Sequence, residues 1–203
     1  MPISNLLIKN ILGRIRSMNE YDEDDIDMMR YSLQSILWEV EKIIILLILF
    51  SLMGKTFISL VSMFALMSIR TNAGGYHSKS SLTCFLSTFF IFFFAIIVLP
   101  LIPLNTLGLL SVCGISFLIT AVLAPIPSKE RESLIKMKRS TAKVLALIMV
   151  VVWSVVVFIF PESIYSKPIL WSVFLQNAQL LFEYIRRKVI MQKEKVYRAN
   201  IPS

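Results

Sequence analysis

The sequence predicts an all-α, polytopic membrane protein with about six transmembrane helices. Of its 203 residues, 56% are hydrophobic and only 17% are charged, which is too apolar for a water-soluble domain of this size. The charged residues gather near the N-terminus, between residues 129 and 143, and after residue 183. Long apolar runs separate these groups, as in a chain that crosses a bilayer several times. We expect a single membrane-embedded domain over residues 1–203.

The first 34 residues are expected to form a cytoplasmic or interfacial segment. An acidic run at residues 21–27 indicates a solvated linker and a helix start. No uninterrupted apolar region with a small-residue cleavage site precedes it, so no cleaved signal peptide is expected. An amphipathic helix on the inner leaflet is predicted from apolar residues at four-residue steps beside Lys and Arg, namely Ile3, Leu7, Ile11 and Ile15.

Transmembrane helices are predicted within residues 36–182. The six apolar runs are 36–53, 57–69, 82–104, 106–124, 144–160 and 169–182. Gly54 and Lys55 separate the first two runs, which predicts two helices, with one kinked helix as the alternative. The last run is the weakest, because it contains three amides that could also pack against a partner chain in a homodimer: Gln176, Asn177 and Gln179.

The distribution of Lys and Arg predicts the orientation in the membrane. Six spans place both termini on one side, and the segments expected there hold Arg70, Lys79, six basic residues from Lys129 to Lys143, and the basic tail at 183–203. The opposite loops hold only Lys55 and Lys167. Because cytoplasmic loops carry the excess of positive charge, both termini are expected inside the cell.

The segment RTNAGGYHSKSSLTC, residues 70–84, contains the only histidine of the chain, His77, and one of its two cysteines, Cys84. Two glycines before His77 permit a sharp turn. The serines at 80 and 81 can cap a helix that begins there, which puts Cys84 in its first turn. The exposed N–H groups of a first turn stabilise a thiolate. Cys113 lies in the middle of an apolar run and is expected to be inert packing.

The pairing of His77 with Cys84 predicts nucleophilic catalysis. On one continuous helix the two would lie roughly 10.5 Å apart along the axis, too far for direct contact. The chain between them must therefore leave helical geometry, so that the imidazole can fold back as a general base. A lone histidine near a membrane would more simply be an interfacial ring, but a first-turn cysteine favours the catalytic interpretation. One histidine and two cysteines 29 residues apart match no metal or disulfide framework, and no cofactor is expected.

This segment resembles the signature of the accessory gene regulator protein B (AgrB) family, which has an Arg, a small-residue or Gly-Gly turn, a His, and a Cys seven residues later. The layout is also similar: an amphipathic N-terminus, paired spans before the motif, and a Pro-flanked basic loop, APIPSKERESLIKMKR, after the fourth span. The resemblance implies a membrane cysteine endopeptidase of Gram-positive quorum sensing. In that family the cysteine removes the C-terminal tail of a small precursor peptide and holds the remainder as a thioester. A nucleophile in the precursor then closes a thiolactone or lactone ring.

Supporting roles are predicted for further residues, each beside a simpler explanation. Arg70 could clamp a substrate carboxylate or extend to the lipid headgroups. Gln34 could donate to an oxyanion or be a plain interfacial residue. Basic residues of the loop could attract an acidic precursor or only reflect the membrane orientation. The set of supporting residues is Arg70, Gly75, Ser81, Gln34, Lys129 and Arg131.

The expected partners are a precursor peptide and the lipid bilayer, without nucleic acid. A small transporter and a non-catalytic scaffold are the alternatives. Against a transporter, no predicted span has a charged residue deep in its middle and the two halves show no repeat. A scaffold would tolerate replacement of both His77 and Cys84.

Overall fold

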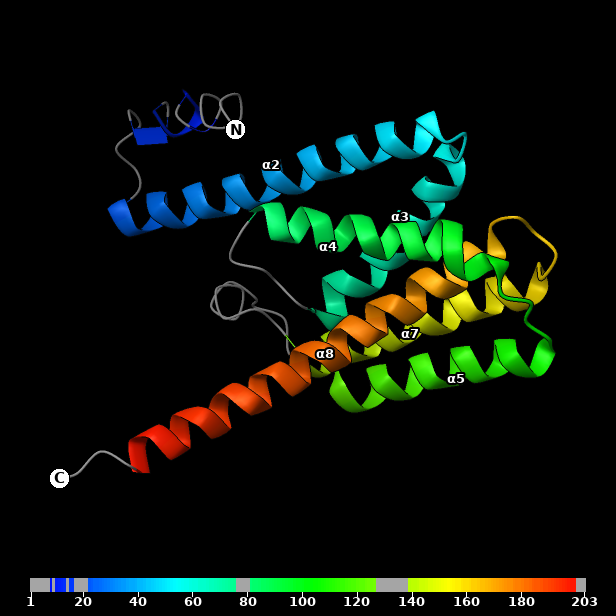
Figure 1. The fold of residues 1–203 in the computed structure, drawn as a ribbon. Coiled ribbons are helices and arrows are strands. Elements are labelled where there is room, and N and C mark those ends of the chain that lie inside the picture. The colour runs from blue at the N-terminus through cyan, green and yellow to red at the C-terminus, as the bar shows by residue number, and fades with distance from the viewer. Residues whose placement is uncertain are drawn as a thin grey trace. The chain divides into compact units, whose positions relative to one another are not determined.

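The computed structural model describes residues 8, 10–13, 15–16, 22–75, 81–126 and 139–199 (Figure 1). The regular elements in these ranges are helices, which confirms the predicted all-α class. The chain divides into two compact units, Met1–Thr56 and Phe57–Ser203, and each is described here by itself.

Helix α2 (Glu23–Leu52) is the main element of the first unit. It begins within the acidic run, as predicted, and it ends where Gly54 adopts a positive φ of 68°. The N–H of Gly54 donates to the Ser51 carbonyl at 2.9 Å, and the N–H of Lys55 donates to the Phe50 carbonyl at 2.8 Å. This pair of bonds is a Schellman motif, which stops a helix by pairing its last carbonyls. Residues 36–69 are therefore two helices and not one kinked helix.

The described part of the N-terminal segment packs on α2. Ile8 and Leu12 are buried together with Ile26 of that helix. Of the predicted apolar face, Ile15 packs against this cluster, whereas Ile11 is 42% exposed. Ile3 and Leu7, which the sequence assigned to the same face, lie outside the described residues.

The second unit is a bundle of helices (Figure 1). Its helices are α3 (Thr56–Ala73), α4 (Ser81–Phe93), α5 (Thr106–Leu123), α7 (Arg139–Ile159) and α8 (Ser166–Ala199). Helix α4 continues through a π-helical turn, η1 (Phe94–Val98), and a short 3-10 turn, η2 (Leu99–Leu101). The side chain of Asn105 then caps α5 by accepting the N–H of Gly108 at 2.8 Å, so the predicted break before α5 is confirmed.

Four helical stretches are long and apolar enough to cross a membrane. They are Thr56–Ala73, Leu82–Leu101, Thr106–Leu123 and Arg139–Ile159. The first and last predicted spans, 36–53 and 169–182, are helical but belong to the longer helices α2 and α8. Length and composition thus support four of the six predicted spans, and the count of six stays a prediction.

Small side chains allow the helices of the second unit to approach closely. Ala65 of α3, Ala146 and Val150 of α7, and Leu180 of α8 are fully buried in one apolar core. Trp153 of α7 adds a polar tie to α3, since its Nε1–H donates to the Ser68 hydroxyl at 2.9 Å. Close packing and interhelical hydrogen bonds are what hold helices together where lipid removes the hydrophobic driving force.

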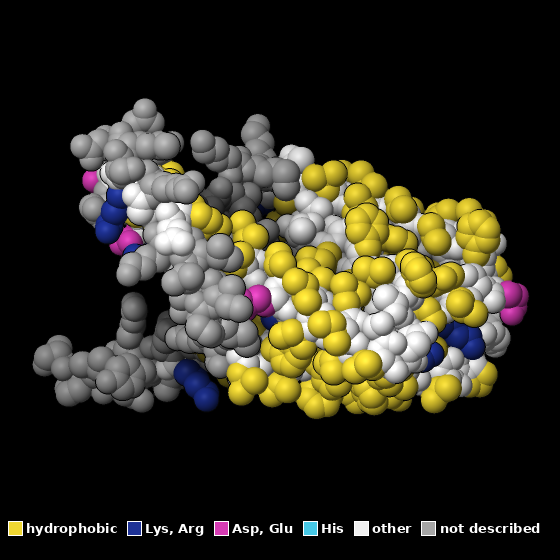
Figure 2. Space-filling model, turned by 90° about the horizontal axis from the view of Figure 1, so that it is seen from above, with side chains coloured by type: hydrophobic (Ala, Val, Ile, Leu, Met, Phe, Trp, Pro, Cys, Tyr) yellow, Lys and Arg dark blue, Asp and Glu magenta, His cyan; other side chains and the backbone are white. Residues whose placement is uncertain are grey.

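Apolar side chains also cover the outside of the described helices. Figure 2 shows hydrophobic side chains over most of the visible described surface. Phe57 of α3 is 72% exposed and Val122 of α5 is 74% exposed. A surface of this kind on apolar helices is the surface of a membrane protein.

Helix α8 continues far beyond the last predicted span, and an ion pair network around one buried carboxylate lies where the apolar part ends. The Glu183 side chain is buried and accepts hydrogen bonds from Arg186 Nε at 2.7 Å and Arg187 Nε at 2.8 Å. Burial raises the pKa of Glu183, but the hydrogen bonds and positive charges of the two arginines outweigh it. The net pKa of this carboxyl therefore lies below its usual range.

Replacing Glu183 with Gln is expected to lower the free energy of unfolding at neutral pH by about 1.5–3 kcal/mol, because charge-assisted hydrogen bonds are lost. A carboxyl with a lowered folded pKa stabilises the fold above its unfolded pKa, and this stabilisation disappears as pH falls through the folded pKa. The difference between Glu183→Gln and the unmodified chain should therefore shrink in acid. Thermal unfolding followed by helical circular dichroism in detergent, from pH 7 to pH 3, measures this. The exposed Glu162 provides the control variant Glu162→Gln, and an equal loss in both variants would contradict the assignment.

Candidate active site

The two glycines of the motif end helix α3. Gly74 has a φ of 79° and Gly75 has a φ of 148°, both in the region that favours glycine. The N–H of Gly74 donates to the Arg70 carbonyl at 2.9 Å, which closes the last turn of α3. The sharp turn predicted at this point is present.

The turn at Gly74 and Gly75 is held by two other parts of the chain. Gln176 Nε2 of α8 donates to the Gly74 carbonyl at 2.9 Å. The N–H of Ile126, just after α5, donates to the Ala73 carbonyl at 2.9 Å, and Gly74 and Ile126 form an isolated parallel bridge. The chain that enters the His77 segment therefore lies beside the chain that enters the predicted basic loop.

Gly75 touches the same amide. A Cβ atom at this position would lie 3.3 Å from Gln176 Nε2, which is tighter than an ordinary contact. The positive φ would strain any other residue as well. Position 75 thus requires glycine for its backbone and for the approach of α8.

Arg70 lies in the last turn of α3 and also contacts α8. Its Nη1 donates to Gln179 Oε1 at 3.2 Å. A second contact with α8 is buried: the hydroxyl of Thr120 in α5 donates to Asn177 Oδ1. Each of the three amides that the sequence offered to a partner chain makes a hydrogen bond within this chain, and the homodimer stays a prediction.

Cys84 occupies the first turn of α4, as the sequence predicted. The helix begins at Ser81, and Cys84 is half-buried. Its carbonyl accepts the Thr88 hydroxyl at 2.8 Å, a bond within the helix. The N–H groups at a helix start point toward its N-terminal end and give that end a partial positive charge, which favours a negative charge near it.

Within its described residues, the structure does not show the other predicted site residues near Cys84. His77, Lys129 and Arg131 lie outside the described residues, as does the side chain of Ser81. Gln34 is half-buried in α2 and belongs to the first unit. The pairing of His77 with Cys84 stays a prediction.

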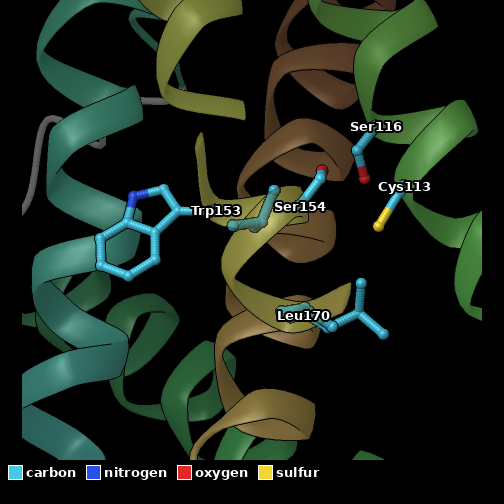
Figure 3. A pocket seen from close by; sticks show the side chains of 7 residues that line it. Cys113, Ser116, Trp153, Ser154 and Leu170 are labelled. Carbon is cyan, nitrogen blue, oxygen red and sulfur yellow. The ribbon is translucent and has the colours of Figure 1, made fainter. Parts of the chain in front are cut away.

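Cys113 lies apart from the motif, in the packed middle of α5. It is buried and points toward Ser154 of α7, with Ser116 and Leu170 around it (Figure 3). This agrees with the predicted role of Cys113 as packing. Within the ranges that the structure describes, no three His, Cys, Asp or Glu side chains gather closely enough to hold a metal ion.

Sequence reasoning missed Gln176, Gln179 and Ile126 as neighbours of the motif. A signal existed for the two glutamines, because amides three residues apart lie on one face of a helix and an apolar helix rarely carries them without a partner. Nothing in the local sequence marks Ile126, whose backbone alone makes the contact.

Comparison with known proteins identifies the family. The family model "Accessory gene regulator B" matches residues 3–180. A putative AgrB-like protein of Clostridium beijerinckii is 30% identical over 158 residues, which cover 77% of each chain. Accessory gene regulator protein B of Staphylococcus epidermidis is 25% identical over 184 residues, 89% of this chain and 92% of the relative. The protein of that name from Staphylococcus aureus (strain bovine RF122 / ET3-1) is 24% identical over 169 residues, 82% of this chain and 88% of the relative.

No solved structure matches the chain. The match over nearly the whole length, together with a Gly-Gly turn before a first-turn cysteine, leads to one conclusion. The chain belongs to the accessory gene regulator B family.

Proposed function

We propose that this protein is a membrane cysteine endopeptidase that processes a precursor of a cyclic quorum-sensing peptide. The whole chain acts as one peptidase domain, with its termini and its active site on the cytoplasmic side of the cell membrane. Membership of the family supports a role in processing the accessory gene regulator peptide. The observation that carries the cysteine mechanism is the position of Cys84 in the first turn of α4, directly after the Gly74–Gly75 turn.

In the proposed reaction, the Cys84 thiolate attacks the carbonyl carbon of one peptide bond in the precursor. His77 takes the thiol proton and then gives it to the leaving amine, so that the C-terminal tail departs and a thioester remains. A nucleophilic side chain of the precursor attacks this thioester, which closes a thiolactone or lactone ring and releases Cys84. The thioester conserves the acyl activation provided that water is excluded.

The helix start supplies the electrostatic part of the mechanism. Backbone N–H groups in the first turn of α4 are the proposed donors to the oxyanion, because N–H groups point toward the N-terminal end of a helix, where Cys84 lies. Gln34 is then not needed as a donor. The apolar surroundings of the helix limit the access of water.

Basic residues are proposed to bind the precursor. The bridge between Gly74 and Ile126 joins the entrance of the motif to the entrance of the loop with Lys129 and Arg131. The positive charges of Lys129 and Arg131 would attract an acidic segment of a peptide bound at Cys84. Arg70, already held by Gln179, is proposed to shape the end of α3.

The catalytic assignment is tested by alkylation with iodoacetamide at neutral pH, with the purified chain in lipid. Cys84 should react faster than the buried Cys113 by about tenfold or more, because thiolate content and access control the rate. His77→Ala should slow Cys84 without changing Cys113. Mass spectrometry of the two cysteine peptides measures both rates in one sample.

Cys84→Ala should abolish cleavage of a precursor peptide in the same preparation, since the acyl-enzyme cannot form. Retained cleavage, or two cysteines that react equally slowly, would instead support a non-catalytic transporter or scaffold.

Changing both Lys129 and Arg131 to Gln should raise the KM for the precursor about 3–10-fold at low salt, with kcat unchanged, because long-range attraction assists binding and not chemistry. The increase should fall as salt is added. Lys167→Gln, on the opposite predicted side of the membrane, is the matched control. A KM that stays the same in the double variant would leave these charges a role in membrane orientation alone.

A further inference from the structure

We propose that Gln176 of α8 is a positioning residue for the peptidase reaction, because it fixes the glycine turn from which the chain leads to His77. This inference rests on the proposed function of His77 and Cys84. Gln176 lies 102 residues from Gly74 in the sequence, yet its Nε2 donates to the Gly74 carbonyl at 2.9 Å.

The contact holds a place that helix geometry alone would leave loose. Gly74 follows the last residue of α3, so its carbonyl has no partner in that helix. Glycine also has the largest conformational freedom of any residue. The hydrogen bond from Gln176 restricts this freedom at Gly74, and the same amide lies beside Gly75, where a Cβ atom would be 3.3 Å from Nε2.

Fixing the turn restricts His77. One residue, Tyr76, separates Gly75 from His77, and the two Cα–Cα steps between them span at most about 7 Å. An anchored Gly75 therefore limits the volume that the imidazole can occupy. A general base needs such limits, because a displacement of about 1 Å at a reacting group can cost on the order of 100-fold in rate.

The second polar atom of Gln176 offsets the stability that its bond to Gly74 supplies. The side chain is 1% exposed, and its Oε1 has no hydrogen-bond partner among the described residues. A buried acceptor without a partner lowers stability. An apolar side chain of the same length would remove that penalty but would leave the Gly74 carbonyl without its donor, so the amide serves the turn and not its own pairing.

The test uses Gln176→Met, which keeps length and approximate volume and removes both polar atoms. In the full chain in lipid, we expect the thermal unfolding midpoint to change little, because the unpaired Oε1 is removed while the Gly74 carbonyl loses its donor. The rate of iodoacetamide alkylation at Cys84 at pH 7 should fall about tenfold or more, since the base is no longer positioned. The alkylation rate at Cys113 should not change.

Thr120→Val is the matched control. It removes the hydroxyl that donates to Asn177, the neighbour of Gln176, and leaves the turn untouched. This variant should lower the unfolding midpoint and leave the Cys84 rate unchanged. Gln176→Met would then lower the reactivity of Cys84 with little change in stability, and Thr120→Val would lower stability with no change in the reactivity of Cys84.

Wild-type alkylation of Cys84 in Gln176→Met would overturn the inference. So would a rate that falls only together with the unfolding midpoint, or an equal slowing in Thr120→Val, because the rate would then follow stability. The variant His77→Ala distinguishes a failure of the proposed catalytic pair from a failure of the role of Gln176. If His77→Ala also reacts at the unmodified rate, the proposed catalytic pair fails as well; if His77→Ala is slow, only the role of Gln176 fails.

Discussion

A helix that ends among apolar neighbours leaves carbonyl groups that the chain itself must pair, and this constraint governs the region around the motif. At the end of α3 three such carbonyls accept hydrogen bonds from three different parts of the chain. Their donors are the N–H of Gly74 for Arg70, the N–H of Ile126 for Ala73, and Nε2 of Gln176 for Gly74. The break that frees the motif from helical geometry is therefore also the place where α3, the end of α5 and α8 are tied together.

Hydroxyl and amide side chains meet the same constraint in different ways. Ser111, Ser116 and Ser154 each donate to the carbonyl four residues earlier in their own helix, so they need nothing from a neighbour. An amide has both a donor and an acceptor on a longer side chain, and Gln176 and Asn177 reach across to other elements. The amides of α8, and the Thr120 and Ser68 hydroxyls that bond across helices, therefore help to specify which helix faces which, whereas these three serine bonds do not.

The sequence predicted the parts of the fold that depend on local chemistry. The turn at Gly54, the helix stop at Gly74 and the first-turn position of Cys84 all follow from residues within a few positions. The full length of α8 was missed, because hydropathy detects an apolar run, while the helix continues past Glu183 through ion pairs one turn apart. The glutamines of α8 signal that this helix face needs a polar partner, but the sequence could not identify Gly74 as that partner, since the contact joins residues 102 apart in the chain.

The motif turn combines a well-held backbone with an unfavourable buried atom. Four buried side-chain atoms of the described chain have no hydrogen-bond partner: Ser62 Oγ, Trp171 Nε1, Ser172 Oγ and Gln176 Oε1. Each such atom costs about 1–3 kcal/mol. A hydroxyl can rotate toward a carbonyl of its own helix, but the amide of Gln176 cannot turn Oε1 toward a donor without withdrawing Nε2 from Gly74. The orientation of the amide is thus set by the bond from Nε2 to Gly74, although Oε1 is left without a donor. Local choices that oppose stability in this way are expected where a chain must hold a reactive group in place.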